Sequence, residues 1–211
     1  MSLINNLKMG IKLMILVVAL LLCSVVVAGI GIGEMRKIDA QADMMYEYDM
    51  LALRAAKEAN IQLIMASRSL VNMIFAEPGQ LDAAKQRYAG YVQRVREELE
   101  KVRPKAVSPE GEAAYKEAAE SFEGIVPLNE EILPLMGVSS PQEIFQAISK
   151  VRDEVNRADD AMSALGKVMA DEADARSLDT TATAASAFIA MCVTIGVAIL
   201  LGGLLGMLIG R

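Results

Sequence analysis

The sequence predicts an all-α protein: an up-down-up-down antiparallel four-helix bundle flanked by two transmembrane helices. Three observations carry this prediction. Two long runs near the ends contain no charged residue, the charges are concentrated between these runs, and the apolar residues of the middle recur at helical spacing without an alternating strand pattern. The middle is therefore expected to form one domain, and the two ends are expected to lie in a different environment.

Charge and composition limit the possible functions. All 27 acidic residues and 18 of the 21 basic residues lie between Glu34 and Asp179, so this middle is strongly acidic and unsuited to binding nucleic acid. The chain has no His, which leaves no imidazole base and no His-ligated metal. Because no nucleophile–base pair, phosphate-binding loop or metal constellation is visible, we expect no catalytic residue, no metal site and no cofactor.

The first uncharged run predicts a transmembrane helix over residues 13–33. It reads LMILVVALLLCSVVVAGIGI from Leu13 to Ile32, and about 20 apolar residues are needed to cross the hydrocarbon core. A cleavable signal peptide is the alternative, but its apolar region would be shorter, about 7–15 residues, and would end at a small-x-small site. The sequence AGIGIGEM matches such a site poorly. We therefore expect an uncleaved anchor.

The second run predicts another transmembrane helix over residues 184–209. It is charge-free from Thr180 to Gly210. Lys8 and Lys12 precede the first span and Arg211 follows the second, so the positive-inside rule places both termini in the cytoplasm of a two-pass inner-membrane protein. Residues 1–12 are then a cytoplasmic stub, residues 34–181 a periplasmic domain, and residues 210–211 the start of a cytoplasmic connection.

The first two bundle helices are expected at 35–76 and 81–103. The first continues from the membrane span without a break and ends at EPGQ. The second carries apolar residues at steps of three and four, the mark of a helix face that packs on other helices. These residues are Leu81, Ala84, Tyr88, Tyr91, Val95, Leu99 and Val102.

The third and fourth bundle helices are expected at 109–136 and from 141 onward. The third carries a stripe of Ala114, Ala118, Phe122, Ile125, Leu128, Ile132 and Leu135, and Pro134 should loosen its last turn. Ser140, Pro141 and Glu143 form a capping box before the fourth helix. This helix should run unbroken into the second span, with a stripe of Ile144, Ile148, Val151, Val155, Ala158, Met162, Leu165 and Met169.

Arg68 is the one charged residue in the apolar segment ANIQLIMASRSLVNMIF, residues 59–75. Counted along unbroken helices, it stands about 52 Å above Gly33, and Ser149 stands about 51 Å above Thr183. Guanidinium groups grip carboxylates through paired hydrogen bonds. The candidate site for a small anion, such as an organic acid, therefore comprises Arg68, Asn72, Phe145, Ser149 and Arg152, with Asn156 on the same face.

A structural role for Arg68 is the alternative, because isolated arginines in bundles commonly pair with an acid or extend into solvent. The acidic groups at 97–100 and 130–131 favour a solvated face over a metal site, since carboxylate sites in bundles usually include His. The bundle methionines, and Cys23 and Cys192 in the apolar runs, are best explained as apolar filling.

The opening LKMGIKLMILVVALLL resembles the amino terminus of bacterial methyl-accepting chemotaxis receptors. The stretch GIGEMRKIDAQADMMYEYDMLALRAAKEANIQLIMASRSL resembles the first helix of their four-helix-bundle sensor domain. The ending LLGMLIGR resembles the entry to a HAMP relay domain. The resemblance implies a homodimeric receptor that binds an attractant or repellent at the distal end of a periplasmic bundle and signals by a small sliding of the fourth helix and the second span.

Family members that bind amino acids grip the carboxylate with arginines across the dimer interface. Only Arg68 matches, because residues 61–75 hold no second Arg. The resemblance also implies contact with CheA/CheW-type signalling proteins, but only through a C-terminal domain that would follow Arg211. Two alternatives stay open: a membrane-anchored interaction or adaptor protein, and the sensor part of a histidine kinase or diguanylate cyclase.

Overall fold

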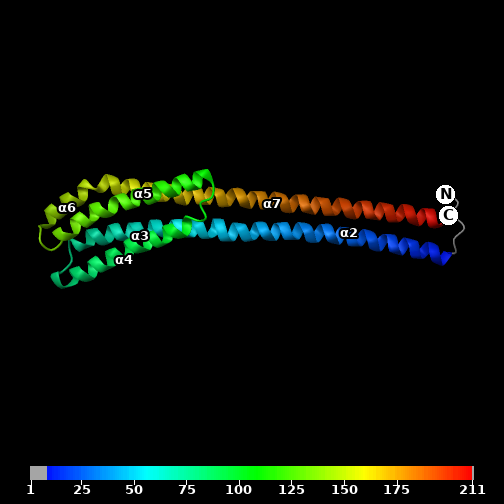
Figure 1. Ribbon diagram of the computed structural model, residues 1–211, viewed down its shortest axis with the longest axis horizontal. Coiled ribbons are helices and arrows are strands. Elements are labelled where there is room, and N and C mark those ends of the chain that lie inside the picture. The colour runs from blue at the N-terminus through cyan, green and yellow to red at the C-terminus, as the bar shows by residue number, and fades with distance from the viewer. Residues whose placement is uncertain (1–8, 211) are drawn as a thin grey trace. The chain divides into compact units, whose positions relative to one another are not determined.

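The computed structural model describes residues 9–210, and all secondary structure in that range is helical (Figure 1). The chain divides into two compact units. One comprises residues 44–176, and the other comprises the flanking segments before residue 44 and after residue 176. The all-α four-helix-bundle class predicted from the sequence is confirmed.

The helical stretch from Met9 to Met73 is not α-helical throughout. The α-helix α2 spans Met9–Met44, the π-helix η1 spans Met45–Met50, and the α-helix α3 spans Leu51–Met73. The helix that was expected to continue from the first span without a break is confirmed as far as Met73, although six of its residues adopt the wider π geometry and it ends three residues earlier than residue 76. Segments of π-helix are rare and are found mostly at functional sites.

The second and third bundle helices follow the predicted stripes. After the 3₁₀ turn η2 (Pro78–Gln80), α4 spans Leu81–Val102 and α5 spans Pro109–Ile132. The 3₁₀ helix η3 (Leu133–Leu135) contains Pro134, so the loosened last turn is confirmed. The stripe of α5 differs from expectation near its end: Val126 and Asn129 are buried, whereas Leu128 is half-buried.

The fourth bundle helix begins as predicted but is interrupted. The Ser140 hydroxyl caps α6 (Pro141–Lys150) by accepting a hydrogen bond from the Glu143 amide, and the Glu143 carboxylate accepts one from the Ser140 amide, so the capping box is confirmed. Val151 has φ −99° and ψ 2°, outside helical values, and α7 then spans Arg152–Gly210. The unbroken helix expected from residue 141 is therefore wrong, because the backbone at Val151 breaks it.

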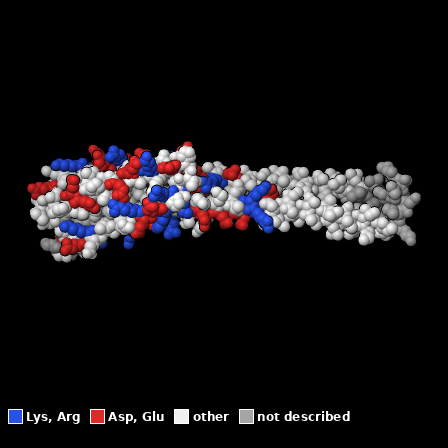
Figure 2. All heavy atoms as spheres, viewed as in Figure 1, with Lys and Arg blue, Asp and Glu red and all other residues white. Residues whose placement is uncertain are grey.

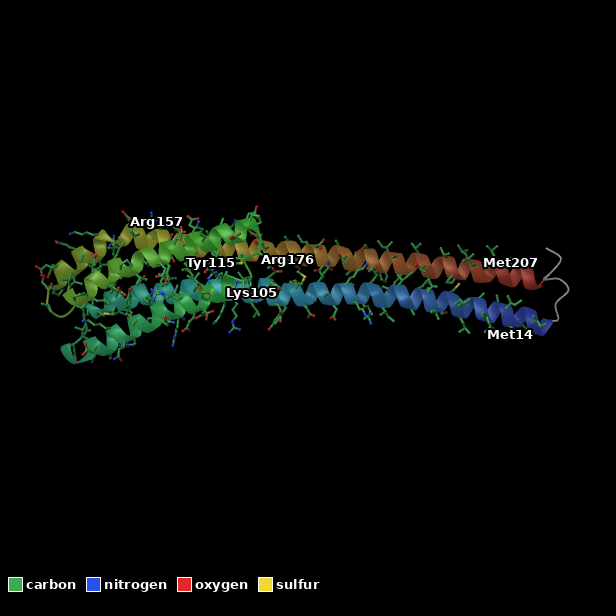
Figure 3. All side chains as sticks on the ribbon, in the orientation of Figure 1. Met14, Lys105, Tyr115, Arg157, Arg176 and Met207 are labelled. Carbon is green, nitrogen blue, oxygen red and sulfur yellow. The ribbon has the colours of Figure 1, made fainter. Side chains whose placement is uncertain are left out.

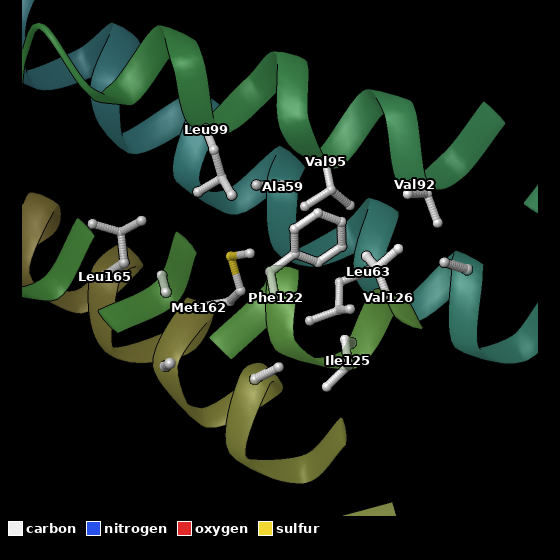
Figure 4. Close-up of a cluster of buried hydrophobic side chains, with 14 of the residues drawn as sticks. Ala59, Leu63, Val92, Val95, Leu99, Phe122, Ile125, Val126, Met162 and Leu165 are labelled. Carbon is white, nitrogen blue, oxygen red and sulfur yellow. The ribbon is translucent and has the colours of Figure 1, made fainter. Parts of the chain in front are cut away.

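One apolar core joins all four bundle helices. Phe122 of α5 lies at its centre, 1% exposed, and contacts from α3, α4 and α7 surround it (Figure 4). The α3 side of the core is rich in alanine, whereas α7 contributes larger residues. From α3 come Ala52, Ala55, Ala56, Ala59, Leu63, Ala66, Leu70 and Met73, and from α7 come Ala158, Ala161, Met162, Leu165 and Met169.

The turn between α5 and α6 depends on a glycine. Gly137 has φ +82°, a left-handed conformation that side-chain-bearing residues rarely adopt. A Cβ atom placed there would also lie 2.8 Å from Leu81 Cδ2. Conformation and packing therefore both select glycine at this position.

The second unit consists of two apolar helical segments that approach each other closely through glycines. A Cβ atom on Gly31 would lie 3.5 Å from Met191 Sδ, and one on Gly202 would lie 3.0 Å from Leu20 Cδ2. Small residues allow such close approach between membrane helices. Both helices contain stretches long and apolar enough to cross a membrane. Charged side chains cover the bundle residues in Figure 2 but are absent from much of these segments.

Candidate functional site

Helix α3 has two apolar faces, and this explains its composition. One face lies in the bundle core. The other is exposed and follows steps of three and four residues along the helix. We call it the outer stripe: Ile61 (48% exposed), Ile64 (37%), Met65 (39%) and Val71 (39%), continued by Phe75 (81%) in the turn just after α3. Arg68 lies in the middle of the outer stripe and is itself exposed. A row of exposed apolar residues on one helix is typical of a surface that another helix covers.

Arg68 lines a pocket between α3 and α4, which we call the α3–α4 pocket. Its volume is about 360 Å³, within the range of small-molecule sites. The α3 side contributes Arg68, Ser69 and Asn72, of which Arg68 and Asn72 are four residues apart and share a helix face. Arg87 and Tyr91 of α4 line the opposite side. Amide, hydroxyl and guanidinium donors from two helices therefore meet in one hollow.

The α3–α4 pocket carries positive charge without a balancing acid. Neither Asp nor Glu lines it, and neither Arg68 nor Arg87 makes a salt bridge within residues 9–210. Arg87 Nε donates only to the carbonyl of Ala83 on its own helix, at 3.4 Å. Two guanidinium groups with unused donors provide the planar, forked geometry that matches a carboxylate or phosphate.

A neighbouring pocket between the same helices has a different character. It is lined by Arg54, Lys101 and Lys105, but also by Glu58 and Glu98. Lys101 Nζ lies 2.5 Å from Glu98 Oε1, and Gln62 Nε2 donates to Glu58 at 2.6 Å. Because two carboxylates line this second pocket and one of its cations, Lys101, is already paired with Glu98, it is less suited to an anion than the α3–α4 pocket.

The five residues of the predicted site fall into two groups. Arg68 and Asn72 lie together in the α3–α4 pocket, but Phe145, Ser149 and Arg152 do not line it. Phe145 is 54% exposed on α6, and the Ser149 hydroxyl donates to the Phe145 carbonyl at 2.8 Å. The interruption at Val151 places Ser149 on α6 and Arg152 on α7, so the two residues do not lie on one continuous helix.

Arg87 and Tyr91 are pocket residues that the sequence analysis missed. The signal was present, because the short turn at 74–80 forces α3 and α4 to lie antiparallel. Residues equally far from such a turn lie at the same level, and Arg68 and Arg87 are nearly equally far from it. The sequence-based site instead placed Arg68 at the level of Ser149 on the fourth bundle helix.

No group of three His, Cys, Asp or Glu side chains between residues 9 and 210 is arranged to hold a metal ion. Cys23 and Cys192 are free thiols. The ion pairs on the bundle surface join neighbouring turns or, at Arg96–Glu123, neighbouring helices.

A four-helix bundle flanked by two membrane-length apolar helices defines a sensory module of the kind carried by transmembrane receptors. A family model described as a four helix bundle sensory module for signal transduction matches residues 6–184. The chain belongs to this family, the sensory module of methyl-accepting chemotaxis proteins, and the resemblance seen in the sequence is confirmed. No curated protein matches the chain.

Proposed function

We propose that this sensory module binds a small organic anion in the α3–α4 pocket and reports it to a cytoplasmic signalling domain of a chemoreceptor. The observation that carries the proposal is the presence of Arg68 and Arg87 in one pocket that no acid lines. Asn72 and Tyr91 supply neutral polar groups that orient a bound carboxylate. Phe145, Ser149 and Arg152 are then outside the ligand contacts made by a single chain.

The outer stripe supports a homodimer in which α3 of one copy packs against α3 of the other. Such an interface would bury Ile61, Ile64 and Val71, which are exposed in the single chain. Arg68 lies within this stripe, so the second copy would cover the open side of the α3–α4 pocket. Exclusion of water strengthens the pairing of guanidinium groups with an anion. Ligand affinity and dimer formation are therefore linked in this proposal.

The direction of the signal follows from the topology proposed for the chain. The bundle faces the periplasm, both termini lie in the cytoplasm, and a ligand acts by favouring one position of α7. A ligand shifts such an equilibrium only by its difference in affinity for the two positions. The support for this arrangement is the pair of membrane-length apolar helices and the family membership.

Calorimetric titration of the full chain in lipid nanodiscs tests the ligand. Succinate, acetate and inorganic phosphate are suitable probes because they separate dicarboxylate, monocarboxylate and phosphate recognition. Loss of one charge-assisted contact should weaken binding about tenfold in Arg68→Ala and in Arg87→Ala. Arg157→Ala is the control, since Arg157 is an exposed arginine of α7 outside the pocket. Absence of binding by all three probes, or equal binding by Arg68→Ala, would refute the site.

Cysteine chemistry tests the dimer and the topology in a chain whose native cysteines are replaced by alanine. Ile61→Cys should form disulfide-linked dimers on mild oxidation, whereas Lys116→Cys, exposed on α5, should not. Val138→Cys lies in the loop before α6, 86% exposed, and should react with a membrane-impermeant maleimide in intact cells. Labelling of Val138→Cys only after lysis would place the bundle in the cytoplasm and exclude the receptor.

A further inference from the structure

Charged residues occupy core positions at one end of the bundle. Asp49 lies three residues before Ala52, and Arg176 lies seven residues after Met169, so each continues the inner stripe of its helix. Asp49 is 3% exposed, and its Oδ1 lies 3.2 Å from an Arg176 guanidinium nitrogen. A carboxylate buried in this way is expensive unless its charge is paired.

The π-helix η1 is held by the loop that follows α4. Lys105 Nζ donates to the Glu47 carbonyl at 2.5 Å and lies 5.4 Å from the centre of the Tyr48 ring. In a π-helix the hydrogen-bond ladder is shifted by one residue relative to an α-helix, so carbonyls near the transition need other donors. Lys105 therefore stabilises the π geometry of the segment that carries Asp49.

The same loop also grips α7. Ser108 donates a short hydrogen bond to Glu172 while accepting one from the Gly111 amide at 2.8 Å. A Cβ atom on Gly111 would lie 2.9 Å from Glu172 Oε1, so α5 and α7 approach closely here. We call these contacts together the polar junction: residues 47–49 of η1, 105–108 of the connection between α4 and α5, 109–111 at the start of α5, and 172–176 of α7. Figure 3 shows Lys105 and Arg176 at the same end of the bundle.

The polar junction is incompletely satisfied. Asp49 Oδ2 is buried and accepts no hydrogen bond within the described residues. Burial also raises the pKa of Asp49, with Arg176 opposing this effect and Glu172 adding to it. Arg176 is thus the main group that stabilises the Asp49 carboxylate in its buried position. Because the carboxylate is incompletely hydrogen-bonded there, the free-energy cost of moving it to solvent is small.

We propose that the Asp49–Arg176 pair is a latch between η1 and α7. When α7 moves so that Arg176 leaves Asp49, the carboxylate loses its cation, Asp49 leaves the interior, and η1 relaxes toward α-helix. Loss of one π turn changes the helix by one residue, a rise of about 1.5 Å. This inference rests on the proposed function, because α7 is the helix that carries the signal in a sensor.

Hydrogen–deuterium exchange of the full chain in nanodiscs, without ligand, tests the latch. In Arg176→Gln, residues 45–52 should exchange about tenfold faster, since an unpaired buried carboxylate favours local opening. The double variant Arg176→Gln/Asp49→Asn should restore slow exchange, because no charge is then left unpaired. Arg157→Gln removes an exposed arginine of the same helix and should leave residues 45–52 unchanged (Figure 3).

Three results would overturn the latch. They are unchanged exchange in Arg176→Gln, failure of Asp49→Asn to restore protection, and an equal increase in peptides around Phe122, which would mean general loosening of the bundle. Arg176→Lys keeps a positive charge but loses the guanidinium geometry. Exchange of residues 45–52 in this variant should be intermediate between the unaltered chain and Arg176→Gln, which keeps the test usable even if Arg176→Gln folds poorly. Because no anion is added, failure here leaves anion binding untouched, and failure of anion binding leaves the exchange result intact.

Discussion

Arg96 of α4 holds Glu123 of α5 in a two-pronged ion pair, with Arg96 Nε 2.7 Å from Glu123 Oε1 and the Arg96 terminal nitrogen 2.9 Å from Oε2. It joins two helices that also meet in the core next to Phe122. Both side chains are partly exposed, at 41% and 52%, so water and salt weaken the attraction. The pair therefore aligns the two helices more than it stabilises them.

Glu123→Gln should change how stability depends on pH. The hydrogen bonds from Arg96 lower the pKa of Glu123 below 4.5. The stabilisation is therefore present above the ordinary pKa and is lost as the pH falls through the lowered one. We expect Glu123→Gln to lower the free energy of unfolding by at most about 1 kcal/mol at neutral pH, with the difference vanishing in acid. Thermal unfolding followed by circular dichroism in detergent micelles measures this. Glu120→Gln, which removes an exposed acid one turn away, should show a smaller effect at neutral pH.

Asp49→Asn should show the opposite pH dependence. Burial raises the pKa of Asp49 above 3.8, so protonation favours the folded chain. This contribution is fully present below the ordinary pKa and is lost as the pH rises through the raised one. The charged groups facing Asp49 are Arg176 and Glu172 of α7. Lys105 donates a hydrogen bond to the backbone carbonyl of Glu47, two residues before Asp49. Asp49→Asn should therefore be more stable than the unaltered chain near neutrality and equal to it in acid, as measured by thermal unfolding. A variant less stable at neutral pH would contradict this.

Phe122→Ala should destabilise the bundle strongly. Phe122 is 1% exposed and lies among side chains of the other three helices, so truncation leaves a cavity (Figure 4). The expected loss is about 3–5 kcal/mol of unfolding free energy. Phe75→Ala provides the matched control, because Phe75 is 81% exposed in the single chain. Thermal unfolding in detergent, at a concentration where the chain is monomeric, compares the two. Equal effects would mean that the core lies elsewhere.

Gly31→Cys paired with Met191→Cys should form a disulfide within one chain, in a background without native cysteines. A Cβ atom on Gly31 lies 3.5 Å from Met191 Sδ, so positions 31 and 191 face each other, and a small movement of the two helices brings a cysteine pair there to bonding distance on oxidation. The native Cys23 and Cys192 should not form one, because Cys23 lies beside Ile195 and Ile199 rather than beside Cys192. Mass spectrometry of peptides after oxidation in membranes distinguishes the two pairs. A native Cys23–Cys192 bridge within one chain would show that the two helices pair in another register.

Most of the fold could be predicted from sequence patterns within single helices. The features that could not be predicted depend on contacts between helices. The stripes of α4 and α7 and the capping box at Ser140 depend on residues a few positions apart, so the sequence alone predicted them. The π-helix η1 accepts a hydrogen bond from Lys105, which is 58 positions from Glu47, and no local pattern in the sequence indicates the π geometry. The irregular backbone at Val151 likewise has no sequence signal, since Val151 continues the apolar stripe.

The candidate site was predictable in part for the same reason. Arg68 and Asn72 were found because a single arginine in an apolar helix is conspicuous in the sequence. Arg87 was missed because the helix facing Arg68 was inferred by counting residues from the two membrane spans. That count assumes unbroken helices. Counting from the nearer turn at 74–80 avoids that assumption and places Arg87 beside Arg68.

The inward side of α7 carries Met162 and Met169 on either side of Leu165, each no more than 2% exposed. A thioether side chain has three rotatable bonds and no branch, so it refills nearby space when its surroundings shift. A small axial displacement of α7 can therefore be absorbed by rotation of these two side chains without opening a void. The bundle thus combines a rigid aromatic centre at Phe122 with a compliant lining on α7, one of the two helical stretches that continue out of the bundle.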